Sequence, residues 1–301
     1  MSAPDVSAPV GGASVAAGTL YVVATPIGNL GDITFRAIDV LRGVSLVVAE
    51  DTRHSRTLLS RYGIATPTSS YHEHNEARET PRLVARLQEG DSIALVTDAG
   101  TPLVSDPGAR LVRAAIDAGI PVVPIPGASA LLAALVAAGL PAERFTFLGF
   151  LPRKGRERDA ALQGIARSPY TTVLYESPHR VADTLSDLAG AGCVDRPAVV
   201  ARELTKRFEE HRRGTVRELA DALAGAEVRG EVVVVVAGAG ESEGELTEDG
   251  ARAEARRLLA AGSSPRDVVD RLQQLGVARN VAYRLAHERF DTDEAAAGAA
   301  D

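Results

Sequence analysis

Cysteine and tryptophan are the residue types that this chain almost lacks. Among its 301 residues one is cysteine, none is tryptophan, and aromatic residues make up 4%. A single cysteine, Cys193, excludes internal disulfides and any zinc site built on several cysteines. We therefore expect a cytoplasmic location and a core of alanine, valine, leucine and isoleucine.

Several patterns of membrane, metal-binding and nucleotide-binding proteins are also absent. No run of residues approaches the roughly 20 apolar residues of a membrane span, and residues 1–18 lack the basic and apolar segments of a signal peptide, so we predict a disordered tail and no membrane partner. No cluster of histidine, cysteine or carboxylate residues has metal-ligand spacing, which predicts no metal. The chain contains neither GxxxxGK[ST] nor GxGxxG, which disfavours a P-loop and the usual dinucleotide or methyltransferase loop.

Acidic residues outnumber basic ones, but they are concentrated at two places. The formal net charge is −7, and nine acids lie in residues 241–249 and 291–301. Without those nine the remainder carries +2, and residues 251–290 hold eight arginines against four acids. A basic face on an acidic protein is therefore possible, and nucleic acid is not excluded as a partner.

Short apolar runs alternate with helical patterns along the first half of the chain. The runs TLYVVAT, SLVVAE, SIALVTD and PVVPI are separated by segments with helical spacing, which predicts a parallel sheet covered on both faces. The pattern then resumes as far as EVVVVVAG, which predicts a second α/β domain, and a helical piece follows. We expect a tail at 1–18, α/β domains at 19–125 and 126–240, an acidic linker at 241–250, a helical domain at 251–290 and an acidic tail at 291–301.

Four loops rich in glycine and proline follow the predicted strands. They are ATPIGNLGD, EDTRHSR, TDAGTPLVSDPG and PIPGASA. Ligands of parallel sheets bind at the carboxyl ends of the strands, and small residues allow a ligand to approach the backbone closely. These loops predict a ligand slot, although ordinary strand-to-helix turns remain an alternative for any one of them. In the third loop we expect the helix to begin at Asp106-Pro107.

A set of motifs across the chain resembles one known family. TPIGNLGDIT, EDTRHSRTLL, YHEHNE, VTDAGTPLVSDPG, PIPGASA, FLGFLPRKGRER, LYESPHR and ARELTKRFEE together are similar to the ribosomal RNA small subunit methyltransferase I family. That family belongs to the tetrapyrrole methylase-like methyltransferases. The resemblance implies two α/β domains of that type, the first with a parallel and the second with a mixed sheet, plus the C-terminal helical piece, which has helix-turn-helix spacing.

The resemblance also implies a function, a cofactor and partners. It implies 2′-O-methylation of a cytidine, position 1402 in ribosomal numbering, of 16S ribosomal RNA, with S-adenosylmethionine as methyl donor. The partners would be 16S ribosomal RNA or the small ribosomal subunit and a second copy of the chain in a homodimer. Two alternatives stay open, a tetrapyrrole C-methyltransferase of the same superfamily and a non-catalytic RNA-binding protein.

Matching positions in the motifs imply which residues contact the cofactor. These are Pro26, Ala99, Gly100, Thr101 and Val104 from the first domain, Ser129 and Ala130 from the inter-domain segment, and Glu176 and Leu204 from the second domain.

Methyl transfer to a ribose hydroxyl requires a group that accepts the hydroxyl proton. A carboxylate or a histidine near the strand ends is expected, with Glu50 first and Asp98 second, and the other candidates are Asp51, His54, His72, Glu73 and His74. The alternative roles are structural, because Glu50 could only pair with Arg53 and Asp98 could only cap its own turn.

RNA must be held through its phosphates, which arginine and lysine contact. The candidate RNA-binding residues lie near the proposed cleft and after the strand FTFLGF, and they are Arg53, Arg56, Arg153, Lys154, Arg156 and Arg180. The C-terminal helices either bind RNA or form a structural cap or dimer contact.

Overall fold

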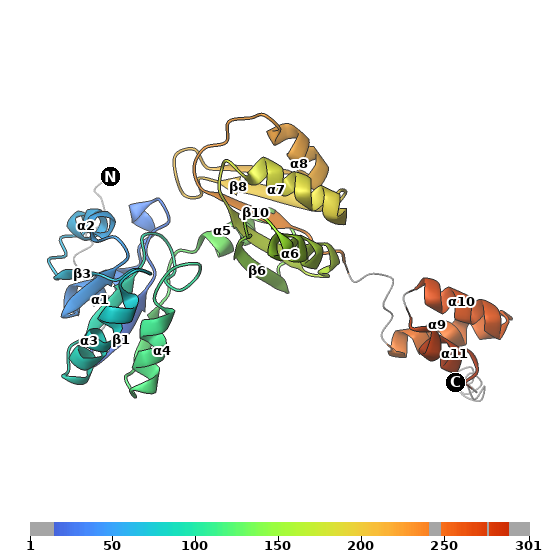
Figure 1. Ribbon diagram of the computed structural model, residues 1–301, viewed down its shortest axis with the longest axis horizontal. Helices are drawn as coiled ribbons and strands as arrows, with labels where there is room; N and C mark the ends of the chain where they lie inside the picture. Colours follow the sequence, from blue (N-terminus) through green and yellow to red (C-terminus); the bar gives the residue numbers. More distant parts are fainter. Residues whose placement is uncertain (1–14, 241–247, 276, 289–301) are drawn as a thin grey trace, which may run out of the picture. The chain divides into compact units, whose positions relative to one another are not determined.

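The computed structural model describes residues 15–240, 248–275 and 277–288 (Figure 1). Its chain divides into two compact units, one ending at Ala237 and the other beginning at Gly238. The acidic tail and most of the acidic linker lie outside the described residues, as do residues 1–14 of the predicted disordered tail. Residues 15–18 of that tail are described, and the Ala16 N–H donates a hydrogen bond to the Tyr21 hydroxyl at 2.8 Å.

The first sheet is fully parallel, as predicted. Its order is β3-β2-β4-β1-β5. The strands are β1 (Leu20–Val23), β2 (Leu46–Ala49), β3 (Thr68–Ser70), β4 (Ile93–Val96) and β5 (Val122–Ile125). Because β4 lies between β1 and β2, the loops that follow these three strands meet at one edge of the sheet.

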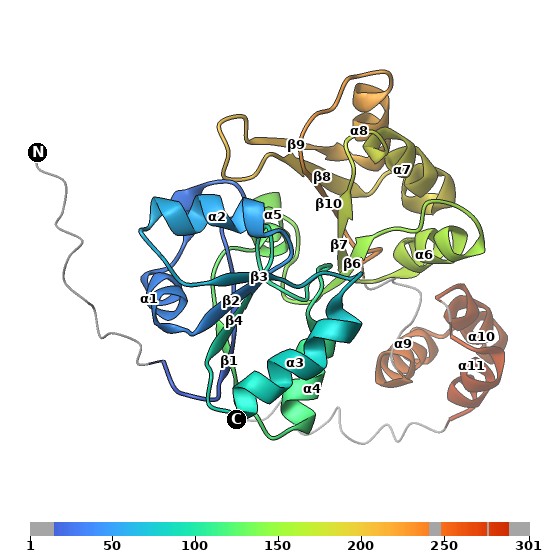
Figure 2. The ribbon, with the colours of Figure 1, turned by 60° about the vertical axis from the view of Figure 1, so that its left-hand side comes forward.

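Helices cover both faces of this sheet (Figure 2). On one face pack α1 (Phe35–Gly43) and α2 (Thr52–Arg61), and on the other α3 (Glu76–Gln88) and α4 (Ala109–Asp117). Each face buries its own cluster of Val, Leu, Ile and Ala, and each fully buried Leu or Ile contributes about 1.5–3 kcal/mol relative to exposure. Asp51 caps α2 by accepting the Arg53 N–H at 2.8 Å, which fixes the start of this helix just after β2.

The helix after β4 begins later than expected. We predicted a start at Asp106-Pro107, but α4 starts at Ala109, and Gly108 at its N-cap has a φ of 126°. A side chain at Gly108 would collide with Leu95, since an added Cβ would lie 2.7 Å from a Leu95 methyl carbon. Only glycine fits this close, left-handed position. Asp106 therefore belongs to the loop and not to the helix.

The second sheet is mixed, as the family resemblance implied. Its order is β6-β7-β10-β8-β9, in which β6 and β7 are parallel and the other neighbours antiparallel. The strands are β6 (Phe145–Phe150), β7 (Thr171–Glu176), β8 (Pro197–Arg202), β9 (Glu210–Thr215) and β10 (Val232–Val236). Val232 pairs with both Glu176 and Arg202, so the start of β10 adjoins the ends of β7 and β8.

The two faces of the second sheet are covered unequally. Three helices, α6 (Arg156–Arg167), α7 (Val181–Leu188) and α8 (Val216–Leu223), pack on one face, and α5 (Ala130–Ala138) packs on the other. The outer side of α5 is apolar and exposed, with Leu132 50% and Val136 77% exposed. Large exposed apolar side chains on one helix are typical of a contact surface.

The described residues of the second unit form three helices with a core of their own. They are α9 (Glu248–Ala260), α10 (Pro265–Gln274) and α11 (Arg279–Ala286). Ser264 caps α10 in a capping box with Asp267, and Pro265 occupies the first turn. The core of the unit contains Ala251, Ala255, Val268, Leu272, Ala282, Leu285 and Ala286. The predicted helical piece is therefore confirmed.

Candidate functional site

One cleft in the first unit collects residues from both sheets. Its volume is about 390 Å³. Its walls come from the loop after β4, the start of α5, the ends of β6 and β7, and the residues that lead into β10. The lining residues are Ile27, Ala99, Gly100, Thr101, Val104, Ser105, Asp106, Ser129, Ala130, Phe150, Tyr175, Glu176, Ser177, Pro178, Gly230, Glu231, Val232 and Val233.

The loop after β4 is held in an unusual backbone conformation. Gly100 has a φ of 86°, and the non-glycine residues Leu103 and Ser105 have φ values of 71° and 68°. Such left-handed non-glycine residues carry a conformational cost and are enriched at functional sites. The loop is also tied to its neighbours, because Gly100 and Thr25 exchange two backbone hydrogen bonds and the Thr101 hydroxyl donates to the Ala128 carbonyl at 3.3 Å. It forms a rigid wall.

Most of the residues implied for cofactor contact line this cleft. They are Ala99, Gly100, Thr101, Val104, Ser129, Ala130 and Glu176. The other two lie elsewhere: Pro26 is buried beside the Thr25–Gly100 pair, and Leu204 is buried in the cluster beneath α5. The structure therefore brings together the loop after β4, the start of α5 and the end of β7, and it leaves Pro26 and Leu204 outside the lining of the cleft.

The Glu176 carboxylate is buried and engaged within the fold. It accepts hydrogen bonds from the Ser177 N–H and the Thr184 hydroxyl, both at 2.7 Å, and lies 3.5 Å from the Arg180 guanidinium. Arg180 in turn donates to the carbonyls of Leu151 and Pro152. The ESPHR motif thus connects the end of β7 to the loop after β6.

A second arginine, which is buried, completes this network. Arg158 on α6 forms an ion pair with Asp187 at 2.7 Å, donates to the Thr184 hydroxyl at 3.0 Å and donates to the Pro152 carbonyl at 3.1 Å. The Pro152 carbonyl is therefore held by two guanidinium groups, from Arg158 and Arg180. Buried charges paired and hydrogen-bonded in this way serve structure.

Asp106 is a cleft residue that our sequence reasoning missed. Its carboxyl is half-buried, and burial raises its pKa to about 6, with the negative charges of Glu50 and Asp98 acting in the same direction and a hydrogen bond with Thr97 opposing them. A raised carboxyl pKa in a cleft is typical of functional sites. The sequence indicated Asp106 only as a helix start, because Asp-Pro commonly opens a helix.

The two predicted catalytic carboxylates lie beside the cleft and not among its lining residues. Glu50 accepts a hydrogen bond from the Thr97 hydroxyl at 3.2 Å and lines a separate surface pocket with Asp51, Thr52, Arg53, Ser70, His72 and His74. Asp98 accepts the Asp51 N–H at 3.1 Å, so it links the loops after β2 and β4 rather than capping its own turn. Their roles in proton transfer stay predictions.

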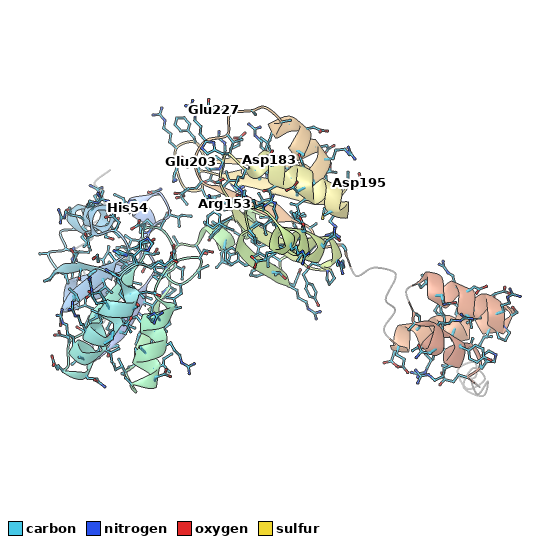
Figure 3. All side chains as sticks on the ribbon, viewed as in Figure 1. His54, Arg153, Asp183, Asp195, Glu203 and Glu227 are labelled. Carbon is cyan, nitrogen blue, oxygen red and sulfur yellow. The ribbon has the colours of Figure 1, made fainter. Side chains whose placement is uncertain are left out.

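The candidate RNA-binding residues fall into three groups. Arg56, Arg153, Lys154 and Arg156 are exposed, and Figure 3 shows Arg153 in the loop between β6 and α6. Arg53 is exposed but pairs with Asp51 at 2.8 Å, not with Glu50. Arg180 is held by Glu176 and by backbone carbonyls, so its guanidinium is engaged within the fold.

Other features of the described residues bear on the class of site. No helix among them is both long and apolar enough to cross a membrane. Nor do they bring together three or more His, Cys, Asp or Glu side chains in a group suited to a metal ion. On the second unit, Arg279, Asn280 and the 61% exposed Tyr283 surround a shallow surface pocket on α11.

Comparison with known proteins identifies close relatives. The family model for tetrapyrrole (corrin/porphyrin) methylases matches residues 19–220. A Pseudomonas aeruginosa protein named ribosomal RNA small subunit methyltransferase I is 49% identical over 91% of this chain and 99% of its own length. A protein of the same name from Mesorhizobium japonicum is 48% identical over 91% of this chain and 92% of its own length.

Solved structures share the fold at low sequence identity. A cobalt precorrin-4 methyltransferase matches with a TM-score of 0.56 and 20% identity over 73% of this chain and 95% of its own. A uroporphyrin-III C-methyltransferase from Thermus thermophilus, solved with S-adenosyl homocysteine, matches with a TM-score of 0.53 and 21% identity over 74% of this chain and 97% of its own. Both likenesses concern the fold of the two sheets.

Proposed function

Because this chain belongs to the ribosomal RNA small subunit methyltransferase I family of the tetrapyrrole methylases, we propose that it methylates 16S ribosomal RNA with S-adenosylmethionine. In its finer form the proposal is transfer to the 2′-oxygen of a cytidine, position 1402 in ribosomal numbering. The observation that carries it is the cleft in which loop, helix and strand residues from both sheets meet.

The residues of the cleft fit the methyl donor. A volume of about 390 Å³ lies in the range of roughly 300–1,000 Å³ typical of small-molecule sites. Ala99, Gly100, Ala130 and Gly230 are small, so backbone N–H and C=O groups can contact a nucleoside directly. The apolar side chains of Ile27, Val104 and Phe150 supply surface for the adenine and the methionine portion of the donor.

The chain's own contribution to the reaction is largely positional. When bound, S-adenosylmethionine supplies a methyl group activated by its sulfonium, so the donor needs no further activation. The wall of residues 99–104 and the residues Ser129 and Ala130 would hold the donor, and the tied backbone at Gly100 and Thr101 keeps that wall in place. Fixing two reactants in reactive geometry can account for most of a rate enhancement.

The exposed cations support RNA as the second substrate. Arg153, Lys154 and Arg156 follow β6, whose last residue, Phe150, lines the cleft. Phosphate contacts of this kind make affinity fall steeply with salt, by a slope of about one unit for each contact. Replacing these three residues with alanine should therefore reduce the salt dependence of RNA binding.

A homodimer is part of the same proposal. The exposed apolar side of α5, with Leu132 and Val136, is the surface we assign to it, together with Phe208, which is 65% exposed. Because α5 begins at the cleft with Ala130, dimer formation through this helix would also stabilise one wall of the donor site.

The decisive experiment offers three acceptors to the purified protein and tritium-labelled S-adenosylmethionine. The acceptors are unmodified small ribosomal subunits, protein-free 16S ribosomal RNA and uroporphyrinogen. We expect label in the subunit or its RNA, and mass spectrometry of nucleosides should identify 2′-O-methylcytidine. Label in uroporphyrinogen would favour the tetrapyrrole alternative, and no transfer without calorimetric binding of the donor would favour a non-catalytic RNA-binding protein.

A further inference from the structure

Thr97 lies between two carboxyl groups that belong to different pockets. Its side chain is almost fully buried, with 2% exposure. The Thr97 hydroxyl donates to Glu50 at 3.2 Å, and the same hydroxyl acts on Asp106 by lowering its pKa against the effect of burial. A hydroxyl has one proton to donate, so it cannot donate fully to two carboxylates at once. Its position therefore connects the Glu50 carboxylate to the surroundings of Asp106.

Of these two carboxyl groups, only Asp106 lines the donor cleft. Glu50 lines the separate surface pocket beside His72 and His74, with Thr97 between the two pockets. Asp106 shares the cleft with the loop residues assigned to the donor and with Tyr175 from the facing sheet. A group that accepts a proton must be within hydrogen-bond reach of the substrate, and this favours Asp106 over Glu50.

The backbone on both sides of Asp106 has positive φ values, which are costly at Ser105 and require a glycine at position 108. Ser105 has a φ of 68° and Gly108 a φ of 126°. The neighbouring sheet contacts this segment tightly, since a Cβ added to Gly149 would lie 2.8 Å from the Ser105 hydroxyl oxygen. Strain that is held from several sides occurs where a side chain must be presented in one orientation. Here it presents Asp106 to the cleft.

We propose that Asp106 is the catalytic residue that accepts the 2′-hydroxyl proton, with Thr97 and Glu50 as positioning residues. This assignment rests on the proposed function. The ribose 2′-oxygen forms a bond to the methyl carbon while the bond from that carbon to the sulfonium sulfur breaks, and the electron pair of the broken bond stays on sulfur. The proton of the hydroxyl passes to the Asp106 carboxylate, so charge and atoms balance.

The charged and titratable groups that face Asp106 are suited to this role. From the first sheet they are Glu50 and Asp98, and from the second sheet Tyr175, Glu176 and Glu231. No lysine or arginine occurs among the described residues that line the cleft. Burial and the two acidic neighbours raise the pKa of Asp106 to about 6, so near neutral pH the carboxylate is mostly ionised and still a useful base.

The test measures single-turnover methyl transfer to small ribosomal subunits across pH, at saturating S-adenosylmethionine. Wild-type rates should rise with pH through a midpoint near 6. Asp106→Asn should lower the rate by at least about 100-fold and abolish this rise, whereas Asp106→Glu should keep part of both. Glu50→Gln should keep the rise but move its midpoint to lower pH, because one like charge is removed.

Two measurements separate catalysis from structure. Calorimetry should show that Asp106→Asn binds S-adenosylmethionine with an affinity within about twofold of wild type, because the proposal assigns Asp106 to the hydroxyl proton and not to donor binding. Infrared difference spectra of the ligand-free protein should show a protonated carboxyl that titrates near pH 6 in wild type and is absent in Asp106→Asn. Asp117→Asn, at the far end of α4, is the matched control and should match wild type.

The outcomes are distinct. A wild-type rate and pH profile in Asp106→Asn, with donor binding retained, overturns the assignment, and so does loss of the pH-dependent rise in Glu50→Gln. An Asp106→Asn rate that returns to the wild-type value when the S-adenosylmethionine concentration is raised further also overturns it, since Asp106 would then bind the donor only. If the wild-type protein transfers no methyl group to RNA, the proposed function itself fails and the assignment falls with it.

Discussion

The raised pKa of Asp106 predicts that this carboxyl lowers the stability of the folded protein near neutral pH. The ordinary value of 3.8 becomes about 6 in the folded protein, so the group binds a proton more tightly when folded. Its favourable contribution is fully present below pH 3.8 and is lost as pH rises through about 6. Asp106→Asn, which does not titrate, should therefore gain stability relative to wild type as the pH rises from 4 to 8.

The size of this effect follows from the shift. A change of roughly two pKa units corresponds to at most about 3 kcal/mol. Because the carboxyl is only half-buried, screening by water and salt should reduce this to about 1–2 kcal/mol. In a folding unit of this size, such a difference raises the melting temperature of the variant by about 2–8 °C relative to wild type.

Scanning calorimetry of the ligand-free protein at several pH values gives the measurement. The transition of the first unit should be followed, because the helical unit has its own core and can unfold separately. Asp117→Asn is the control, since Asp117 is exposed and pairs only with exposed Arg113, and its difference from wild type should stay constant with pH. A difference for Asp106→Asn that is equally constant, or that shrinks as pH rises, would refute the reasoning.

Four further predictions concern the donor site, the buried network, the C-terminal helices and the surface of α5. Gly100→Ala should weaken S-adenosylmethionine binding at least tenfold in calorimetry, because its φ is 86° and it lines the cleft, whereas Gly119→Ala, with a φ of 71° and open space around it, should not. Arg158→Met should lower the free energy of unfolding in urea by about 1–3 kcal/mol, since the half-exposed Asp187 loses its ion-pair partner and Thr184 and the Pro152 carbonyl each lose a hydrogen-bond donor, and unchanged stability would contradict the network. Deleting residues 245–301 should preserve donor binding in calorimetry and weaken RNA binding in filter assays, and an unchanged RNA affinity would count against a role of the C-terminal helices in RNA binding. Val136→Glu should shift the mass measured by light scattering from dimer to monomer, and an unchanged mass would count against α5 as the dimer surface.

The alternation of apolar strands and helices predicted much of this molecule. Runs ending at Thr25, Glu50 and Asp98 all proved to be parallel strands with their loops at one edge, because buried parallel strands are recognisable as short, β-branched runs. Most of the residues that the motif resemblance implies for donor contact line one cleft. The local sequence was enough to predict that these cleft residues lie close together, because most of them follow directly after a strand.

Other parts of the site depend on contacts that a linear pattern does not contain. Gly230 and Glu231 reach the cleft because β10 runs antiparallel to β7 and β8, so a strand start adjoins two strand ends. Asp106 resembles a helix start in sequence, and only the left-handed Gly108 moves the helix two residues onward. In the sequence Arg180 resembles a surface cation, but in the structure its guanidinium forms an ion pair with the buried Glu176 four residues earlier.

The carbonyl of Pro152, held by two guanidinium groups, has a consequence for how the substrates influence each other. Through Arg158, Arg180, Thr184 and Glu176, the loop that carries Arg153 forms one hydrogen-bonded body with a wall of the donor cleft. An RNA phosphate that orders this loop would also order that wall, and the donor would then bind at a lower entropic cost. Thermodynamic linkage makes such cooperativity reciprocal, so each substrate would increase the affinity for the other by the same factor.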